Sequence, residues 1–512
     1  MKNARRRTIV ALILAFMMVA FVFSACKPEE EPVVEETTKV AATEAPATEE
    51  ATEEPEPEVK LEKITLGTRN FYTEPEVADM LEKQFLEDTG VELEIRHIPQ
   101  EDSTSKIASM FMADDIQDVM HMSGGFISYA IQELIYDVKP YYEANPVLKA
   151  IGDKNPAIIE AATIGDSLYG ISTSNFNTMN MWIRDDLRKE MGVDMPDTMD
   201  ELVDLLRAYQ TNYPDMIPLT SKNMVYYLDV FASYFGTRTR IYMKDGKAVD
   251  PVVTPEYKEF MDFWKSLYDE KLIYQNMPTE GSYGAVRTQF HVGEAASILM
   301  WADIYDNLTK GLRDNGHADA PDLYEKVTYI PAFDGPNGTF GHTFTAADSV
   351  KSVTMNTDMP QEVFDTFFEW YIASPNGIVS SSRGVEGYSF DVVDGVMVPN
   401  EDNGGVHYHG QGFPPVNLDF KFPFTFDPIT QGEYDDILEI FDDYYAHPMA
   451  QTKLVPVHNQ DYTAIIDDWE DGAYGCFWKY VLGEWTYEQY LEEYAKLQSD
   501  WDLENLLANI TE

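Results

Sequence analysis

The chain has 512 residues, of which 89 are acidic and 37 are basic, and its formal net charge at pH 7 is −52. A surface this negative repels nucleic acid and anionic membranes, so neither is expected as a partner. Two cysteines, Cys26 and Cys476, are too few for a disulfide framework or a cysteine-based metal site.

The first 25 residues have the pattern of a secretory signal peptide, because basic "MKNARRR" precedes an apolar run over residues 9–23. That run is short for a membrane span, which needs about 20 residues. Two small residues then precede Cys26, and the stretch resembles a bacterial lipobox, with Phe23 where leucine is usual. The resemblance implies that residues 1–25 are removed and that Cys26 carries the lipid. The alternative is an uncleaved anchor helix.

The next segment is dominated by glutamate and proline. Residues 27–63 contain thirteen glutamates and four lysines and almost no large apolar side chain. Such a composition cannot bury enough apolar surface to offset the entropy of ordering, so we expect a disordered acidic tether over 26–63. About 36 residues of flexible coil would span roughly 30–35 Å. An acidic tail that binds another protein is the alternative.

The remaining chain is long enough for two domains, and it begins with alternating strands and helices. Strand patterns at 63–70, 91–99 and 118–123 alternate with helical patterns, of which 74–90 is the longest. This order predicts an α/β fold with an open, largely parallel sheet covered by helices. Because such sheets bind ligands beyond the carboxyl ends of their strands, Arg69 and Asn70 after the first strand and Phe126 after the third become candidate ligand contacts.

Further along the chain, "GDSLYGIS" (165–172) and "MWIRDDLRKEMGVDMPDTMDELVDLLRAY" (181–209) resemble family 1 extracellular solute-binding proteins, the receptors of ABC importers. The resemblance continues in the expected order over nearly all of 64–512. Its other parts are "TPEYKEFMDFWKSLYDEKLIYQN" (254–276), "FHVGEAASILMWADIYDNL" (290–308), "RGVEGYSF" (383–390) and "KYVLGEWTYEQYLEEYAKL" (479–497).

This resemblance implies a two-lobed periplasmic-binding-protein-like fold of type 2. Each lobe would be an open sheet flanked by helices, with a helical C-terminal part, and the lobes would close on a ligand by a hinge. The first lobe is expected over 64–175 plus 297–350, and the second over 176–296 plus 351–512. The chain would cross between lobes near Thr173–Asn180, Ser297–Met300 and Ala346–Val353.

The resemblance also implies ligand contacts. Asn177 stands in the first crossing, where relatives often place a polar contact, and Trp301 ends "AASILMW", where relatives bring an aromatic ring to the cleft. Asp303 and Tyr388 join the loop residues named above as further candidates. Trp264 shares one helix face with Phe260 and Leu267, so we expect it in the core.

No pattern indicates a catalytic or metal site. His407 and His409 lack a third ligand at a recognisable spacing, and "DDWEDG" lacks the EF-hand spacing. We therefore expect no metal, no cofactor and no enzymatic activity. The negative charge of the protein disfavours a strongly anionic cargo, unless a local basic patch around Arg69 or Arg383 offsets that charge.

The sequence thus predicts a monomeric receptor, lipid-anchored on the extracellular face of a Gram-positive-type cell membrane. It would deliver a solute to the permease subunits of an ABC importer, and an oligosaccharide is the solute that the sequence favours. A cell-surface enzyme that degrades polysaccharide and a ligand-binding partner of a sensor kinase are the alternatives.

Overall fold

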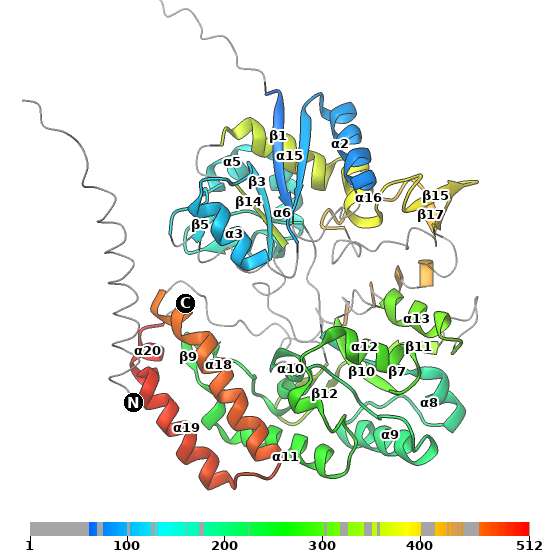
Figure 1. Cartoon of the computed structure of the whole chain (residues 1–512), viewed down its shortest axis with the longest axis vertical. Helices are drawn as coiled ribbons and strands as arrows, with labels where there is room; N and C mark the ends of the chain where they lie inside the picture. Colours follow the sequence, from blue (N-terminus) through cyan, green and yellow to red (C-terminus); the bar gives the residue numbers. More distant parts are fainter. Residues whose placement is uncertain are drawn as a thin grey trace, which may run out of the picture. The chain divides into compact units, whose positions relative to one another are not determined.

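The computed structural model (Figure 1) describes residues 61–510 except 69–74, 100–102, 124–128, 131, 161, 174–178, 224, 302–304, 318–325, 342–350, 356–358, 401–414, 427–429, 433, 436–437, 440–441 and 444–459. The expected signal peptide, Cys26 and nearly all of the tether lie outside the described residues. Residues 60–512 form one compact unit by their internal contacts. Within it, buried apolar side chains form two separate cores, which define the two lobes.

The first lobe is built on a five-stranded sheet in the order β2-β1-β3-β14-β6. Its strands are β1 (Lys63–Thr68), β2 (Glu92–His97), β3 (Val119–Ser123), β14 (Lys351–Met355) and β6 (Ile171–Ser172). β1 pairs in parallel with β2 and β3, as the alternating pattern predicts, while β14 runs antiparallel to β3 and to β6.

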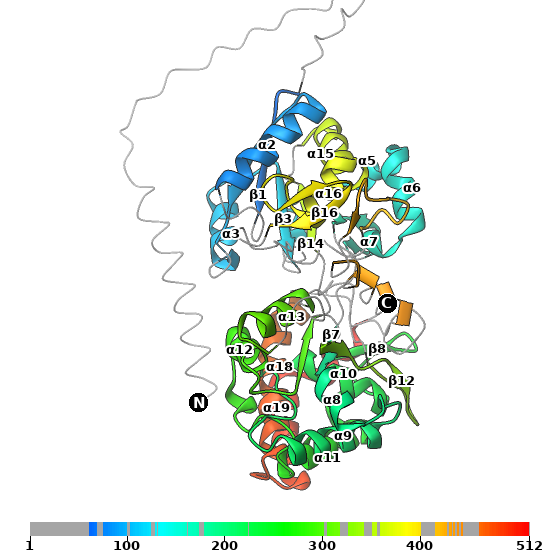
Figure 2. The same ribbon diagram turned by 90° about the vertical axis from the view of Figure 1, so that its right-hand side faces the viewer.

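Helices cover this sheet with apolar faces at helical spacing. On α2 (Pro75–Thr89), Val77, Leu81 and Phe85 are buried, and the Phe85 ring packs edge-on against Trp370 at 5.0 Å. Trp370 belongs to α15 (Gln361–Ala373), and Figure 2 shows α2 and α15 beside β1 and β3. The other elements of this lobe are α3 (Ser103–Met112), α5 (Lys139–Ala144), α6 (Pro146–Lys154), α7 (Ala157–Glu160), α16 (Pro375–Arg383), β4 (Thr163–Ile164), β5 (Ser167–Leu168), β15 (Phe390–Val393), β16 (Val396–Pro399) and β17 (Thr425–Phe426).

The second lobe contains a three-stranded sheet in the order β10-β7-β11, in which β10 (Ser297–Trp301) and β11 (Val327–Tyr329) both run antiparallel to β7 (Met179–Arg184). All six residues of β7 are buried, which suits a central strand covered on both faces. Around it lie α8 (Asp185–Met191), α9 (Met199–Asn212), α10 (Val225–Ala232), α11 (Pro255–Asp269), α12 (Tyr283–His291), α13 (Tyr305–Asp314), α18 (Gln460–Val481), α19 (Tyr487–Trp501), α20 (Leu503–Ala508), β8 (Tyr242–Lys244), β9 (Lys247–Val249), β12 (Phe333–Asp334) and β13 (Thr339–Phe340).

The lobe boundaries differ from the expected ones after residue 296. Residues 297–340 belong to the second lobe, because β10 pairs with β7 along its whole length and Phe340 lies in the second core. Residues 351–383 belong to the first lobe, because β14 pairs with β3 and α15 contributes its phenylalanines to the first core. The crossing expected at Ser297–Met300 is therefore wrong. An apolar strand pattern shows that a strand is buried but does not show which of two cores buries it.

The other two expected crossings lie largely outside the described residues, between elements of the two lobes. The chain leaves the first sheet after Ser172 and enters the second at Met179, and it leaves β13 at Phe340 and returns to the first sheet at Lys351. A further crossing follows β17, because α18 and α19 pack against each other and against the second core (Figure 1).

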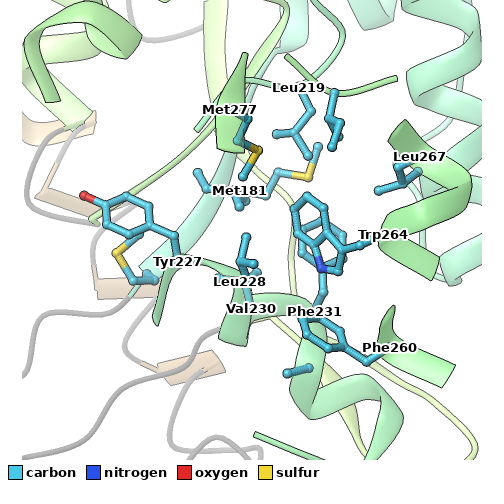
Figure 3. Close-up of a cluster of buried hydrophobic side chains, with 14 of the residues drawn as sticks. Met181, Leu219, Tyr227, Leu228, Val230, Phe231, Phe260, Trp264, Leu267 and Met277 are labelled. Atoms are coloured by element: carbon cyan, nitrogen blue, oxygen red, sulfur yellow. The ribbon is translucent and has the colours of Figure 1, made fainter. Parts of the chain in front are cut away.

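The expected core position of Trp264 is confirmed. Its side chain has no exposed surface, and Phe260 and Leu267 on the same face of α11 are also fully buried. Figure 3 shows Trp264 among Leu267, Phe231 and Phe260. Trp264 meets the rings of Phe231 and Phe260 edge-on, at 5.3 Å and 6.4 Å between ring centroids.

A buried carboxylate attaches α19 to the turn that precedes α11. Asp250 accepts hydrogen bonds from the Tyr494 hydroxyl at 2.9 Å, the Gln498 amide at 2.8 Å and the Val252 backbone N–H at 3.1 Å. Burial raises the pKa of Asp250, and the three hydrogen bonds offset this only in part. The folded state therefore holds a proton on Asp250 more tightly than the unfolded chain does.

This raised pKa predicts a pH-dependent difference between the wild type and Asp250→Asn. The stability that Asp250 contributes is fully present below its unfolded pKa of about 3.9 and is lost as pH rises through the raised folded pKa. The free energy of unfolding of the wild type, relative to that of Asp250→Asn, should therefore fall as pH rises from about 4 to 7. Urea unfolding at stepwise pH measures this difference. A difference that stays constant, or that grows with pH, would show that the Asp250 pKa is not raised.

Candidate functional site

The parallel strands of the first sheet end at one common edge. β1 ends at Thr68 and β3 at Ser123, both at the same edge because the strands are parallel. Ser123 pairs with Lys351 and Ser172 with Ser352, so the two crossings also join the first lobe at this edge. Arg69, Asn70 and Phe126 follow these strand ends in sequence, and all three lie outside the described residues.

The second sheet has a matching edge at the end of β10. Its last residue, Trp301, pairs with Met179, the first residue of β7. Segment 217–220 runs parallel to β10, with Ile217 opposite Ala295 and Thr220 opposite Ile298. The residues after this segment and after β10 therefore emerge at the same edge, where the chain also enters from the first lobe.

Three aromatic rings form a continuous group at this edge, which we call the aromatic row: Trp301, Tyr227 and Tyr283. Tyr227 lies edge-on to Trp301 at 6.3 Å and is tilted toward Tyr283 at 6.1 Å, between ring centroids. Trp301 and Tyr283 are half-buried, whereas Tyr227 is fully buried. Figure 3 shows the Tyr227 hydroxyl pointing away from the rest of the core cluster. The row therefore offers two partly accessible ring surfaces supported by a buried one.

Local structure fixes each member of the row. Trp182 on β7 donates its indole N–H to the Trp301 carbonyl at 3.2 Å, which anchors the end of β10. Tyr283 is the first residue of α12, where the Ser282 hydroxyl caps the helix by accepting the Ala285 N–H at 3.2 Å. Tyr227 lies on α10, and its hydroxyl contacts the Met300 sulfur at 3.8 Å.

A cation lies against the outer ring of the row. The Lys222 Nζ is 3.7 Å from the centroid of Tyr283, which is a close cation–π distance. The neighbouring Asn223 fixes this loop, because its backbone N–H donates to the Glu280 carbonyl at 2.6 Å and its side-chain oxygen accepts the Trp478 indole N–H at 2.8 Å. Lys222 is thus held beside the row by a loop that is attached on two sides.

Comparison with known proteins decides the family. Residues 72–374 match the model of the bacterial extracellular solute-binding proteins. The chain belongs to this family. A solved structure of the "HMO binding ABC-transporter associated Solute Binding Protein" from Bifidobacterium longum infantis is similar over 88% of this chain and 97% of that chain, with a TM-score of 0.64 and 16% identity. The expected two-lobed α/β solute-binding fold is confirmed.

Two curated relatives from Bacillus subtilis (strain 168) match in sequence. Lipoprotein LipO is 22% identical over 338 residues, which cover 62% of this chain and 64% of LipO. The polygalacturonan/rhamnogalacturonan-binding protein YtcQ is 24% identical over 315 residues, which cover 57% of this chain and 60% of YtcQ. The chain therefore spans less than two thirds of the length of these relatives.

In this solute-binding protein, the structure describes two of the seven expected ligand residues. Trp301 lies in the aromatic row of the second lobe, and Tyr388 is half-buried against the first core. Asn177 and Asp303 lie outside the described residues, as do the three residues of the first-lobe loops.

Arg383 does not provide the surface cation that the sequence suggested. Its side chain is 3% exposed, and its guanidinium lies over the rings of Phe426, Phe422 and Tyr434 at 4.5, 5.2 and 5.6 Å. These rings remove Arg383 from solvent, so it cannot attract an anionic solute at the surface.

Burial raises the pKa of Cys476 to about 11, so this thiol is protonated and inert at neutral pH. The described residues contain no cluster of three or more histidine, cysteine, aspartate or glutamate side chains suited to a metal ion. Among the same residues, no helix combines the length and apolar character needed to cross a bilayer.

Proposed function

We propose that this protein captures an oligosaccharide between its two lobes and delivers it to the permease subunits of an ABC importer. The observation that carries the proposal is the aromatic row at the carboxyl end of β10. Sugar rings have apolar faces that stack on aromatic side chains and hydroxyls that bond to polar groups. Half-buried Trp301 and Tyr283 supply ring surfaces of this kind.

Chain length limits how far apart the ends of the two sheets can lie. Six residues separate Ser172 at the edge of the first sheet from Met179 beside Trp301. An extended chain covers about 3.3–3.6 Å per residue, so this connection spans about 25 Å at most. Arg69, Asn70 and Phe126 would contact the sugar from the first lobe, with Tyr388 as a further contact. Asn177 and Asp303 would contact it from the crossing and the end of β10.

Closure follows from this arrangement in physical terms. A ligand that touches both lobes only when they meet stabilises the closed form by its differential affinity for that form. The importer would then recognise the closed lobes. The relatives support an oligosaccharide cargo, because YtcQ is named for polygalacturonan and rhamnogalacturonan, and the Bifidobacterium protein is named as HMO-binding and ABC-transporter-associated.

We further propose that a lipid on Cys26 anchors the protein to the extracellular face of the membrane. The family is extracellular, and LipO is named a lipoprotein. A diacylated cysteine would hold the protein stably, whereas one acyl chain alone binds a membrane only marginally. The acidic tether would then separate the lobes from the bilayer, and the protein would act as a monomer.

A thermal-shift panel tests the proposed function. The full-length protein, extracted in detergent, is heated with neutral and acidic oligosaccharides, with peptides and with metal ions. A ligand at 100 times its Kd adds about 2.7 kcal/mol to the free energy of unfolding, which raises the Tm visibly. We expect an oligosaccharide to raise the Tm and to be recovered intact. A sugar that is hydrolysed would indicate an enzyme, and a response to peptides alone would refute the oligosaccharide cargo.

A further inference from the structure

The aromatic row has a cation at its end that no carboxylate neutralises within the described part of the chain. Lys222 is half-buried, and the only described interaction of its ammonium group is the one with the Tyr283 ring. The nearby Glu280 carboxylate accepts the Ser282 backbone N–H at 2.8 Å. Arg287 of α12 donates from Nε to the Tyr283 backbone carbonyl at 3.4 Å.

Three buried or half-buried arginines of the second lobe are paired with carboxylates. Arg184 lies 2.8 Å from Asp186, Arg188 lies 2.6 Å from Asp185, and Arg238 lies 3.6 Å from Asp229. Unlike these arginines, Lys222 has no carboxylate partner among the described residues. Removing a charge from water is costly unless an opposite charge compensates for it, so an anionic group on the ligand is the natural partner of Lys222.

We propose that Lys222 makes this site selective for oligosaccharides that carry carboxylates, that is, for uronate-containing sugars. The inference rests on the proposed function, because it takes the aromatic row as the sugar-binding surface. The ammonium has three N–H donors, and only one side of it faces the Tyr283 ring. A sugar stacked along the row would therefore present its carboxylate to the remaining donors.

The charge of the protein favours a carboxylate over a more highly charged group. The net charge of −52 opposes the approach of any anion, and this opposition grows with the anion's charge. A single ammonium suits a single negative charge, whereas sulfate and phosphate groups are recognised best by the fork of an arginine. At 0.15 M salt the screening length is about 8 Å, so the local lysine outweighs the distant acids.

Paired sugars that differ only in charge test this inference. Trigalacturonate and trimannuronate, each beside its fully methyl-esterified neutral form, are titrated calorimetrically into the full-length protein at 0.15 M salt. We expect at least one acid to bind about tenfold more tightly than its ester, because a charge-assisted hydrogen bond contributes more than a neutral one. Lys222→Gln should remove this preference by weakening binding of the acid about tenfold while leaving the ester within about twofold. Lys222→Arg should retain the preference.

Lys247→Gln is the matched control, because Lys247 is an exposed lysine on β9 of the same lobe, and it should leave the preference unchanged. Equal affinity for acid and ester, or a preference that survives Lys222→Gln, would overturn the inference. If only neutral oligosaccharides bind, the uronate inference fails while the proposed function stands. If no oligosaccharide of either kind binds, both fail.

Discussion

Replacing Trp264 by alanine is expected to lower the free energy of unfolding of the second lobe by about 3–5 kcal/mol. Trp264 is completely buried, and its ring lies edge-on to Phe231, Phe260 and Trp478. The substitution removes a whole indole ring and leaves a cavity between α11 and α18 that the surrounding rings cannot fill. Guanidinium unfolding followed by circular dichroism measures the loss.

Trp264→Phe is the matched variant. The Trp264 indole N–H is buried without a hydrogen-bond partner among the described residues, so replacing it breaks no hydrogen bond. A smaller ring remains in the cluster, and we expect a loss of less than half that of the alanine variant. A loss below about 1 kcal/mol for Trp264→Ala, or an equal loss for both variants, would contradict the central place of Trp264 in this core.

Replacing Trp301 by alanine is expected to weaken oligosaccharide binding by about 30- to 1000-fold, or about 2–4 kcal/mol. The indole is half-buried at the end of β10 and is supported by Tyr227 behind it. Its removal eliminates the largest ring surface of the row. The fold should be less affected than by Trp264→Ala, because part of the Trp301 ring is already exposed to solvent. Calorimetric titration gives the affinity, and thermal unfolding without ligand gives the stability.

Trp485→Ala serves as the control for this prediction. Trp485 is also half-buried in the second lobe, where the Lys479 ammonium lies 4.4 Å from the ring, and it follows α18 far from β10 in the sequence. We expect Trp485→Ala to reduce stability without changing affinity by more than about twofold. An equal loss of affinity in the two variants would mean that Trp301 acts through the fold and not through contact with the sugar.

Many local elements of both lobes could be predicted from the sequence because their apolar residues recur at the spacing of helices and strands. The parallel order of β1, β2 and β3 and the buried face of α11 both follow from this periodicity. The lobe to which β10 and β14 belong could not be predicted in the same way, because both strands are short. Only their pairing assigns them: β10 pairs with β7 of the second lobe, and β14 pairs with β3 of the first lobe.

The sequence predicts only part of the candidate site. The resemblance to the family indicates Trp301, whose contact with a ligand stays a prediction, but it does not indicate Tyr227, Tyr283 or Lys222. They come from three segments between residues 222 and 283, which are joined at one edge by the isolated pairings of segment 217–220 beside β10. A strand of four residues leaves too weak a pattern to detect. The sequence does contain one indication, because the polar run "TSKN" directly follows the apolar "MIPL". A polar run after a buried strand marks the end at which α/β sheets bind ligands.

The central claim is that the second lobe stacks an oligosaccharide on the aromatic row. A crystal structure of the protein with the oligosaccharide that gives the largest thermal shift tests it most directly. We expect a sugar ring against Trp301, with further contacts from the loops after β1 and β3. A bound sugar that contacts neither Trp301 nor Tyr283, or that touches one lobe only, would contradict it.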